Sequence, residues 1–199
     1  LCGAGVSLDS KLPTFYGLTK HVIDFFDPSK NSTIESEFRP WVEEDSKSQS
    51  KLLKTPLDQI FHLLHQEYGR EEVNTVVAER LKNTGPAEKI SQNHSVIARI
   101  ASDLDGKPQI VTTNFDLLFE QITKPGNLEI YEPPALPDIA IGMPITGITY
   151  LHGRLQGPST LQHQLVLSSA DFGRAYLSEG WATAFIRALL KSYTVVLVG

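Results

Sequence analysis

Cysteine is nearly absent from this sequence, which contains only Cys2. A single cysteine excludes an intrachain disulfide, and it excludes a structural zinc site built from paired thiolates. We therefore expect no zinc ribbon, no metal ligands and a reducing, cytoplasmic compartment.

Long apolar runs and basic blocks are also missing. No segment approaches the roughly 20 apolar residues that span a bilayer. The 18 Lys and Arg against 23 Asp and Glu give a net charge of −5, and no block of consecutive basic residues exists. These features argue against direct binding to nucleic acid or to an anionic membrane surface.

What remains is the composition of an ordinary globular domain, with 199 residues of which 41% are hydrophobic. The chain opens at Leu1 without a methionine, and Val195–Gly199 has the pattern of a strand followed by a glycine turn. We expect from these ends that the sequence is a domain taken from a longer protein.

Helical patterns dominate the first half of the chain. Phe15, Leu18, Val22 and Phe25 follow helical spacing over residues 15–26, and the polar segment 29–50 predicts a loop with one short helix. Thr55 and Pro56 form a helix start, and Gly69 forms a stop. Further helices are expected over 71–82 and 88–104, the latter with Ile90, Ile97, Ala101 and Leu104 on its apolar face.

The second half alternates strands and helices. Residues 109–113 predict a strand buried on both faces, followed by a helix over 117–122. Further strands are expected at 129–131, 147–151 and 193–198, and a helix over 170–191, capped by Ser168 or Ser169 and broken near Gly180. This order predicts an α/β fold, a Rossmann-like open parallel sheet with helices on both faces. Residues 1–28 and 106–199 would form the core, and 29–105 a large helical insertion.

Three polar clusters fall at the expected strand ends, where ligands bind in such sheets. Gly3-Ala4-Gly5-Val6-Ser7 could hold a phosphate through its backbone and a hydroxyl, or could be a plain tight turn. Asn114 and Asp116 would point to one side of the cleft, although Asp116 could simply cap the next helix. His152, followed by Gly153, could transfer a proton near neutral pH or be structural.

The other histidines and the tryptophans carry a weaker signal. His62 and His65 are three residues apart on a helix, but no third metal ligand accompanies them. We expect a structural or solvated role for His21, His62, His65, His94 and His163. Trp41 and Trp181 are expected to pack in the core.

Taken together, the clusters resemble the signature of the sirtuin (silent information regulator) family. The matching segments, in order, are Gly3–Ser7 followed by Leu12-Pro13-Thr14-Phe15, then Thr112-Thr113-Asn114-Phe115-Asp116, then His152-Gly153. This resemblance implies a Rossmann-like domain that uses NAD as a substrate. It implies catalytic roles for Asn114, Asp116 and His152. Binding of NAD would involve Gly3, Ala4, Gly5, Ser7, Pro13, Phe15, Thr113, Asn114, Asp116 and Gly199.

Departures from the family pattern narrow the expected function. Sirtuin deacylases carry a four-cysteine zinc module after the His-Gly motif, which this sequence cannot form. The chain therefore looks like the zinc-free sirtuin-like domains of bacterial antiphage defence proteins, which hydrolyse NAD to nicotinamide and ADP-ribose. The resemblance implies a toxic effector domain that acts as a homo-oligomer or with flanking sensor domains. An NAD-dependent deacylase and a non-catalytic NAD or ADP-ribose sensor remain alternatives.

Overall fold

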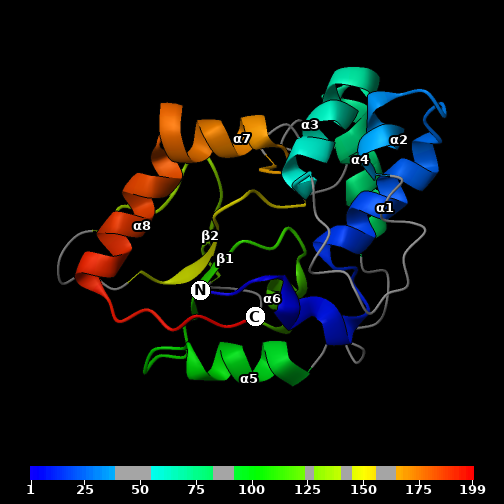
Figure 1. The fold of residues 1–199 in the computed structure, drawn as a ribbon. Helices are drawn as coiled ribbons and strands as arrows, with labels where there is room; N and C mark the ends of the chain where they lie inside the picture. The colour runs from blue at the N-terminus through cyan, green and yellow to red at the C-terminus, as the bar shows by residue number, and fades with distance from the viewer. Residues whose placement is uncertain (39–54, 83–91, 124–127, 140–144, 156–164) are drawn as a thin grey trace.

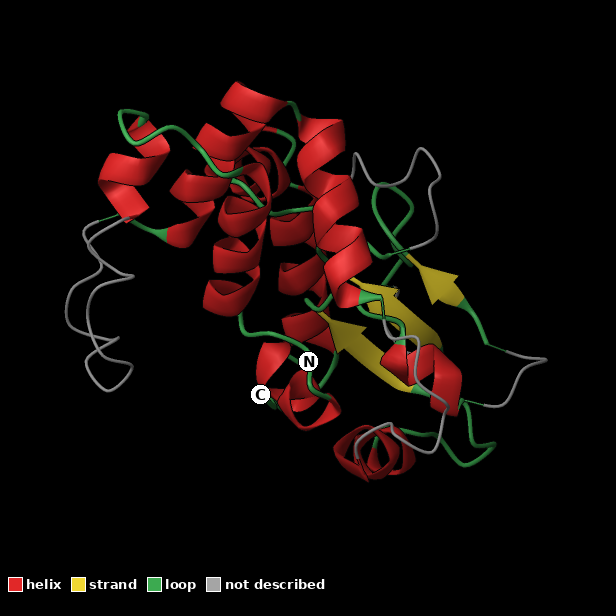
Figure 2. Ribbon diagram, turned by 90° about the vertical axis from the view of Figure 1, so that its right-hand side faces the viewer, coloured by secondary structure: helices red, strands yellow, loops and turns green. Residues whose placement is uncertain are grey.

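A three-stranded parallel sheet organises the protein, as seen in a computed structural model (Figure 1). The structure describes residues 1–38, 55–82, 92–123, 128–139, 145–155 and 165–199. β3 (Gly147–Tyr150) lies between β1 (Gln109–Thr112) and β2 (Ile130–Tyr131), and Figure 2 shows the strands side by side. All three were predicted to within about a residue at each end.

The N-terminal segment extends this sheet through backbone bonds rather than as a full strand. Cys2 forms parallel bridges with Thr112 at the end of β1 and with Val198 on its other side. The predicted strand at 193–198 is thus reduced to this bridge and its neighbouring hydrogen bonds. The 3-10 helix η1 (Ala4–Ser10) follows directly after Gly3.

Successive strand residues point to opposite sides of the sheet, so both of its faces carry apolar side chains. Helices cover both faces. Ile110, Ile148 and Tyr150 pack with α5 (Gln92–Ile100) and α6 (Leu118–Ile122). Val111 and Leu151 pack on the other face, against Phe185 and Leu189 of α8 (Trp181–Ser192). The predicted α/β, Rossmann-like fold is confirmed.

A third hydrophobic cluster is formed by helices, with a few residues from loops next to the sheet. α1 (Phe15–Phe26), α2 (Thr33–Phe38), α3 (Leu57–Tyr68) and α4 (Arg70–Leu81) share one core. Phe25, expected on the apolar face of α1, is 60% exposed, whereas its neighbour Phe26 packs against this core and stacks on Tyr68 with ring centroids 4.3 Å apart.

Two helices pack across the division expected from the sequence. α1, counted there with the core, packs with α3 and α4. α5, counted with the insertion, packs with α6 and η1 on the sheet. Leu104, expected on the apolar face of this helix, lies beyond its end and is exposed. The division into 1–28 with 106–199 and 29–105 stays a prediction. Residues 88–91, Trp41 and His163 lie outside the described residues.

The predicted break near Gly180 is confirmed. Ser168 begins α7 (Ser169–Gly173) with a capping box, in which its hydroxyl accepts from the Asp171 backbone N–H and Asp171 accepts from the Ser168 backbone. A π-helical turn, η5 (Arg174–Ser178), continues α7. Gly180 then takes φ +66°, a left-handed conformation that suits glycine, and α8 begins.

No helix in the described part of the chain is long and apolar enough to cross a bilayer. Within the same ranges, no group of three or more His, Cys, Asp or Glu side chains could hold a metal ion.

Asp171 ties α7 to the helical cluster, and this contact can be tested. Its side chain is fully buried, and one carboxylate oxygen accepts from Arg70 of α4 at 2.6 Å and from Arg174 at 2.9 Å. We expect Asp171→Ala to lower the free energy of unfolding by about 2–4 kcal/mol, because the cap and both ion pairs are lost. Urea unfolding measures this loss.

The control for Asp171→Ala is Asp24→Ala, which removes the exposed Lys20–Asp24 pair and should change stability by less than about 0.5 kcal/mol. Burial raises the pKa of Asp171, but hydrogen bonds from Ser168 and the charge of Arg70 outweigh it and hold the pKa below 3.8. The carboxylate therefore stabilises the fold above its ordinary pKa, and the difference from Asp171→Ala should narrow as the pH falls below that value. An unchanged difference in acid would contradict this assignment.

Candidate functional site

A pocket of about 180 Å³ opens at the carboxyl ends of β1 and β3. This is the edge at which ligands bind in open α/β sheets. The polar residues that line it come from η1, from the segment after β1 and from the turn after β3. Its complete lining is Ala4, Ser7, Leu12, Pro13, Phe15, Leu18, Leu81, Thr113, Asn114, Phe115, Asp116, His152, Val166 and Phe172.

Most of the residues singled out from the sequence meet in this pocket. Those that line it are Ala4, Ser7, Pro13, Phe15, Thr113, Asn114, Asp116 and His152. Gly3, Gly5 and Gly199 do not line it. Gly3 offers its carbonyl oxygen to Asn114, and a Cβ on Gly5 would stand 2.8 Å from the backbone of Gly199.

Asn114 is held by a turn at the end of β1, where its backbone N–H donates to the Thr112 hydroxyl at 3.0 Å. Its side-chain Nδ2 donates to the Gly3 carbonyl oxygen at 3.1 Å and to Ser7 Oγ at 3.0 Å. A carbonyl oxygen can only accept, so the amide nitrogen must be on that side. With both amide hydrogens used, Asn114 has its carbonyl oxygen to offer to the pocket.

Asp116 both lines the pocket and bonds to the start of α6, the two alternatives that the sequence left open. Its Oδ1 accepts from the backbone N–H of Leu118, the first residue of α6, at 3.2 Å, while its Oδ2 accepts from Ser7 Oγ at 2.8 Å. The side chain is buried, and burial raises its pKa although the bonds from Ser7 and Leu118 oppose the shift. Each oxygen keeps lone-pair capacity for a further partner, because a carboxylate accepts about four bonds.

His152 follows β3 and is held against two aromatic rings. Its Nε2 lies 2.7 Å from the Tyr176 hydroxyl, and its ring meets Phe172 and Tyr176 edge to face. Burial lowers the pKa of His152 to about 4. The imidazole is therefore neutral at physiological pH, the form that can accept a proton.

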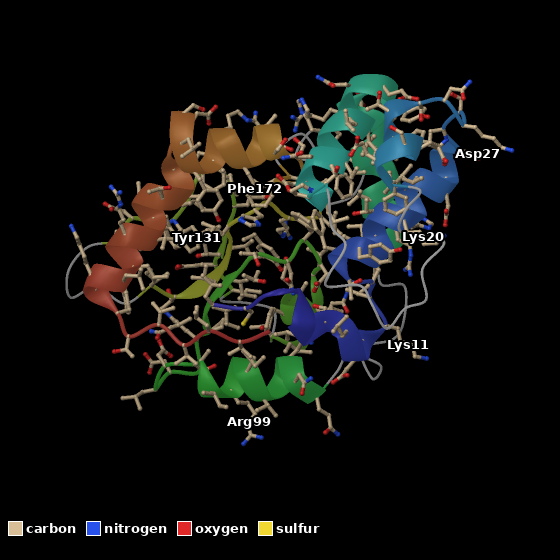
Figure 3. All side chains as sticks on the ribbon, viewed as in Figure 1. Lys11, Lys20, Asp27, Arg99, Tyr131 and Phe172 are labelled. Carbon is tan, nitrogen blue, oxygen red and sulfur yellow. The ribbon has the colours of Figure 1, made fainter. Side chains whose placement is uncertain are left out.

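Sequence reasoning missed Tyr176 and Phe172, which orient His152. Tyr176 stands on the π-helical turn η5, and such turns occur often at functional sites. Phe172, labelled just below α7 in Figure 3, stacks on Tyr176 with centroids 6.0 Å apart. A sequence signal existed only in part, because Phe172 and Tyr176 are four residues apart on an expected helix.

The helical cluster also supplies walls of the pocket, of which only Phe15 was expected from the sequence. Phe15 and Leu18 of α1 and Leu81 of α4 line the pocket opposite the polar groups. Phe15 also stacks on Phe61 of α3 at 5.4 Å, which links the wall to the helical core. The expected insertion therefore helps to shape the site.

His94 also lies beside the site, although the sequence suggested no special role for it. Its side chain is fully buried, and its Nε2 is 3.4 Å from Ser7 Oγ. Burial lowers the pKa of His94, although the negative charge of Asp116 opposes this shift.

The low pKa of His152 predicts a pH-dependent stability. An unfolded histidine binds a proton near pH 6.5, whereas folded His152 does so near 4, so acid favours the unfolded chain. From about pH 7 to pH 5, wild type should lose about 2 kcal/mol more unfolding free energy than His152→Gln. Urea unfolding at both pH values measures this, and His21→Gln should behave as wild type does. Parallel losses in wild type and His152→Gln would contradict the assignment.

Comparison with known proteins agrees with the motifs. Residues 108–199 match the family model of the SIR2-like domain, and this range contains Asn114, Asp116 and His152. An uncharacterized protein of Sinorhizobium fredii, y4cA, is 34% identical over 206 aligned positions, which cover all of this chain. The chain spans 16% of that relative's length. Because SIR2-like domains are NAD-dependent, the match supports the resemblance to sirtuins and an NAD-related activity.

Proposed function

We propose that this chain is a sirtuin-like NAD glycohydrolase, which cleaves NAD to nicotinamide and ADP-ribose. The observation that carries the proposal is the convergence of an oriented amide oxygen, a buried carboxylate and a neutral imidazole, from Asn114, Asp116 and His152, on one pocket. Together these groups suit the hydrolysis of a glycosidic bond to a cationic leaving group.

The reaction requires the bond between ribose C1′ and the nicotinamide nitrogen to break, and the bonding electrons leave with nicotinamide. Positive charge then develops on the ribose, and a water oxygen attacks C1′. The products are nicotinamide, ADP-ribose and one proton. A site for this chemistry must hold the ribose, supply negative potential near C1′ and place the water.

Each group suits one of these tasks. The carbonyl oxygen of Asn114 can accept a hydrogen bond from the attacking water, since its amide hydrogens are already used. The Asp116 carboxylate supplies negative charge inside a largely apolar pocket, where screening by water is weak. Neutral His152 can accept a proton from a ribose hydroxyl or from the water.

The size of the pocket fits one end of the substrate. Ligand pockets usually measure roughly 300–1,000 Å³, so a pocket of about 180 Å³ suits nicotinamide and its ribose rather than the whole dinucleotide. Phe15 and Phe172 offer apolar walls for the nicotinamide ring. The phosphates would lie toward Ala4, which lines the pocket with only a small side chain beside its backbone.

The wider role rests on the same proposal. A relative six times longer than this chain favours an arrangement in which the NAD-cleaving domain is one part of a larger protein. We place the domain in the cytoplasm as the toxic effector of a bacterial defence protein, acting as a homo-oligomer or under flanking sensor domains.

Liquid chromatography of NAD incubated with the protein tests the activity. Nicotinamide and ADP-ribose should appear in equal amounts when NAD is incubated with the wild-type chain. The same result is expected with a longer protein that contains this chain. Asn114→Ala and His152→Ala should each reduce the rate by at least about 100-fold, because water placement or proton transfer is lost. Lys20→Ala, on the outer surface of α1 (Figure 3), is the matched control and should keep full activity.

Other outcomes of this assay favour the alternatives. Nicotinamide release that strictly requires an acyl-lysine peptide would support a deacylase. Tight binding of NAD or ADP-ribose by calorimetry, without any release of nicotinamide, would support a sensor. Full activity in Asn114→Ala or His152→Ala would contradict the roles given to these residues.

A separate variant tests the charge of Asp116. Asp116→Asn keeps the size of the side chain and an oxygen that can accept from Leu118, but removes the negative charge near C1′. We expect kcat to fall by roughly 100-fold while KM changes by less than about fivefold, since the charge acts mainly in the transition state. Steady-state kinetics measure both constants. A roughly 100-fold rise in KM with unchanged kcat would assign Asp116 to substrate binding instead.

A further inference from the structure

One fully buried titratable side chain next to the pocket has no part in the mechanism above. His94 lies in the first turns of α5 and does not line the pocket. Its ring packs edge to face on Phe119 of α6, with centroids 4.7 Å apart, so the ring is held by packing on one side. Its Nε2 lies 3.4 Å from Ser7 Oγ on the other side.

The hydrogen count at Ser7 determines what His94 contributes. A hydroxyl donates once and accepts twice. Ser7 Oγ donates its hydrogen to Asp116 Oδ2 at 2.8 Å and accepts one bond from Asn114 Nδ2 at 3.0 Å. Only one acceptor position remains for His94, so its Nε2 must carry a hydrogen and donate it to Ser7.

This count also revises the expected use of Ser7. With one bond given and two received, its hydroxyl has no capacity left for a phosphate or ribose oxygen in this arrangement. Ser7 instead joins the two groups that face the pocket, Asn114 and Asp116. The orientation of the Ser7 hydroxyl therefore depends in part on His94, which does not line the pocket.

We propose that His94 is a positioning residue of this site, which donates from Nε2 to Ser7 and so holds Ser7, Asp116 and Asn114 in their working orientation. The proposal rests on the NAD-cleaving function given above and extends it to a group that does not touch the substrate. Without the donor, the Ser7 hydroxyl can turn its hydrogen elsewhere, and Asp116 loses a fixed partner. A small displacement of a reacting group is enough to slow catalysis strongly.

Steady-state kinetics of three variants test the proposal. His94→Phe keeps an aromatic ring against Phe119 but has no N–H, and should lower kcat by roughly 10- to 100-fold with KM within about threefold of wild type. His94→Gln restores a side-chain N–H donor and should recover most of kcat. The matched control is Asn93→Ala, which removes the neighbouring bond to Asp9 at 2.7 Å and should leave kcat unchanged.

Coupling to Ser7 separates positioning from a merely structural role. On a Ser7→Ala background, His94→Phe should cause no further loss of kcat, because the effect passes through the Ser7 hydroxyl. Full additivity of the two losses would overturn the proposal, as would unchanged kcat in His94→Phe or no recovery in His94→Gln. If His94→Phe does not fold, His94→Met, which also lacks an N–H, replaces it in the same cycle.

A measurement without NAD distinguishes failure of this proposal from failure of the proposed function. NMR titration of the Asp116 carboxyl carbon reports its pKa directly. Loss of His94 removes a nearby group that lowers this pKa and loosens the Ser7 bond that also lowers it, so the pKa of Asp116 should rise in His94→Phe. An unchanged titration would overturn the positioning role even if wild type cleaves NAD. The expected rise would support it even if wild type does not.

Discussion

The register in which Cys2 pairs with the end of β1 controls the geometry of the whole site. The Cys2 backbone N–H donates to the Val111 carbonyl oxygen at 2.8 Å, and the Cys2 carbonyl oxygen accepts from the Thr113 N–H at 3.0 Å. These bonds place Gly3 where its carbonyl oxygen meets Asn114. Side chains alternate along extended backbone, so a slip of one residue would turn Asn114 away from Gly3. A local backbone pairing therefore brings together two segments more than 100 residues apart.

The polar groups assembled by this register are buried, which makes their mutual satisfaction important. Ser7, Asn114 and Asp116 are each less than 10% exposed. A buried polar group without a partner costs about 1–3 kcal/mol of stability. A buried network with one unsatisfied member therefore stabilises the fold less than apolar side chains in its place would. Here the hydroxyl, the amide hydrogens and both carboxylate oxygens all have partners. The same bonds that stabilise the fold fix which atoms remain to face the pocket.

Strand positions and the polar strand ends were predictable from the sequence, because they depend on local signals. Buried runs such as 109–113 and the groups that follow them mark the sheet edge, and parallel pairing brings such edges together. His94 was not predictable in this way, since its partner Ser7 is 87 residues away. His94 lies three residues before Ile97 and seven before Ala101, which pack in the same cluster as the sheet, yet the sequence left open whether it was structural or solvated. Periodicity places such a residue on the packed face of a helix but does not identify its partner.

The packing of the helical cluster has a consequence for how the site could be controlled. Asp171 of α7 accepts from Arg70 of α4, and the next residue, Phe172, lines the pocket and contacts His152. Leu81, at the other end of α4, lines the same pocket. One helix thus supports both the aromatic side and the aliphatic wall of the pocket. Because packed interiors respond by discrete shifts rather than by smooth deformation, movement of α4 would alter both walls together. The shape of the pocket therefore depends on a helix that lies outside the sheet.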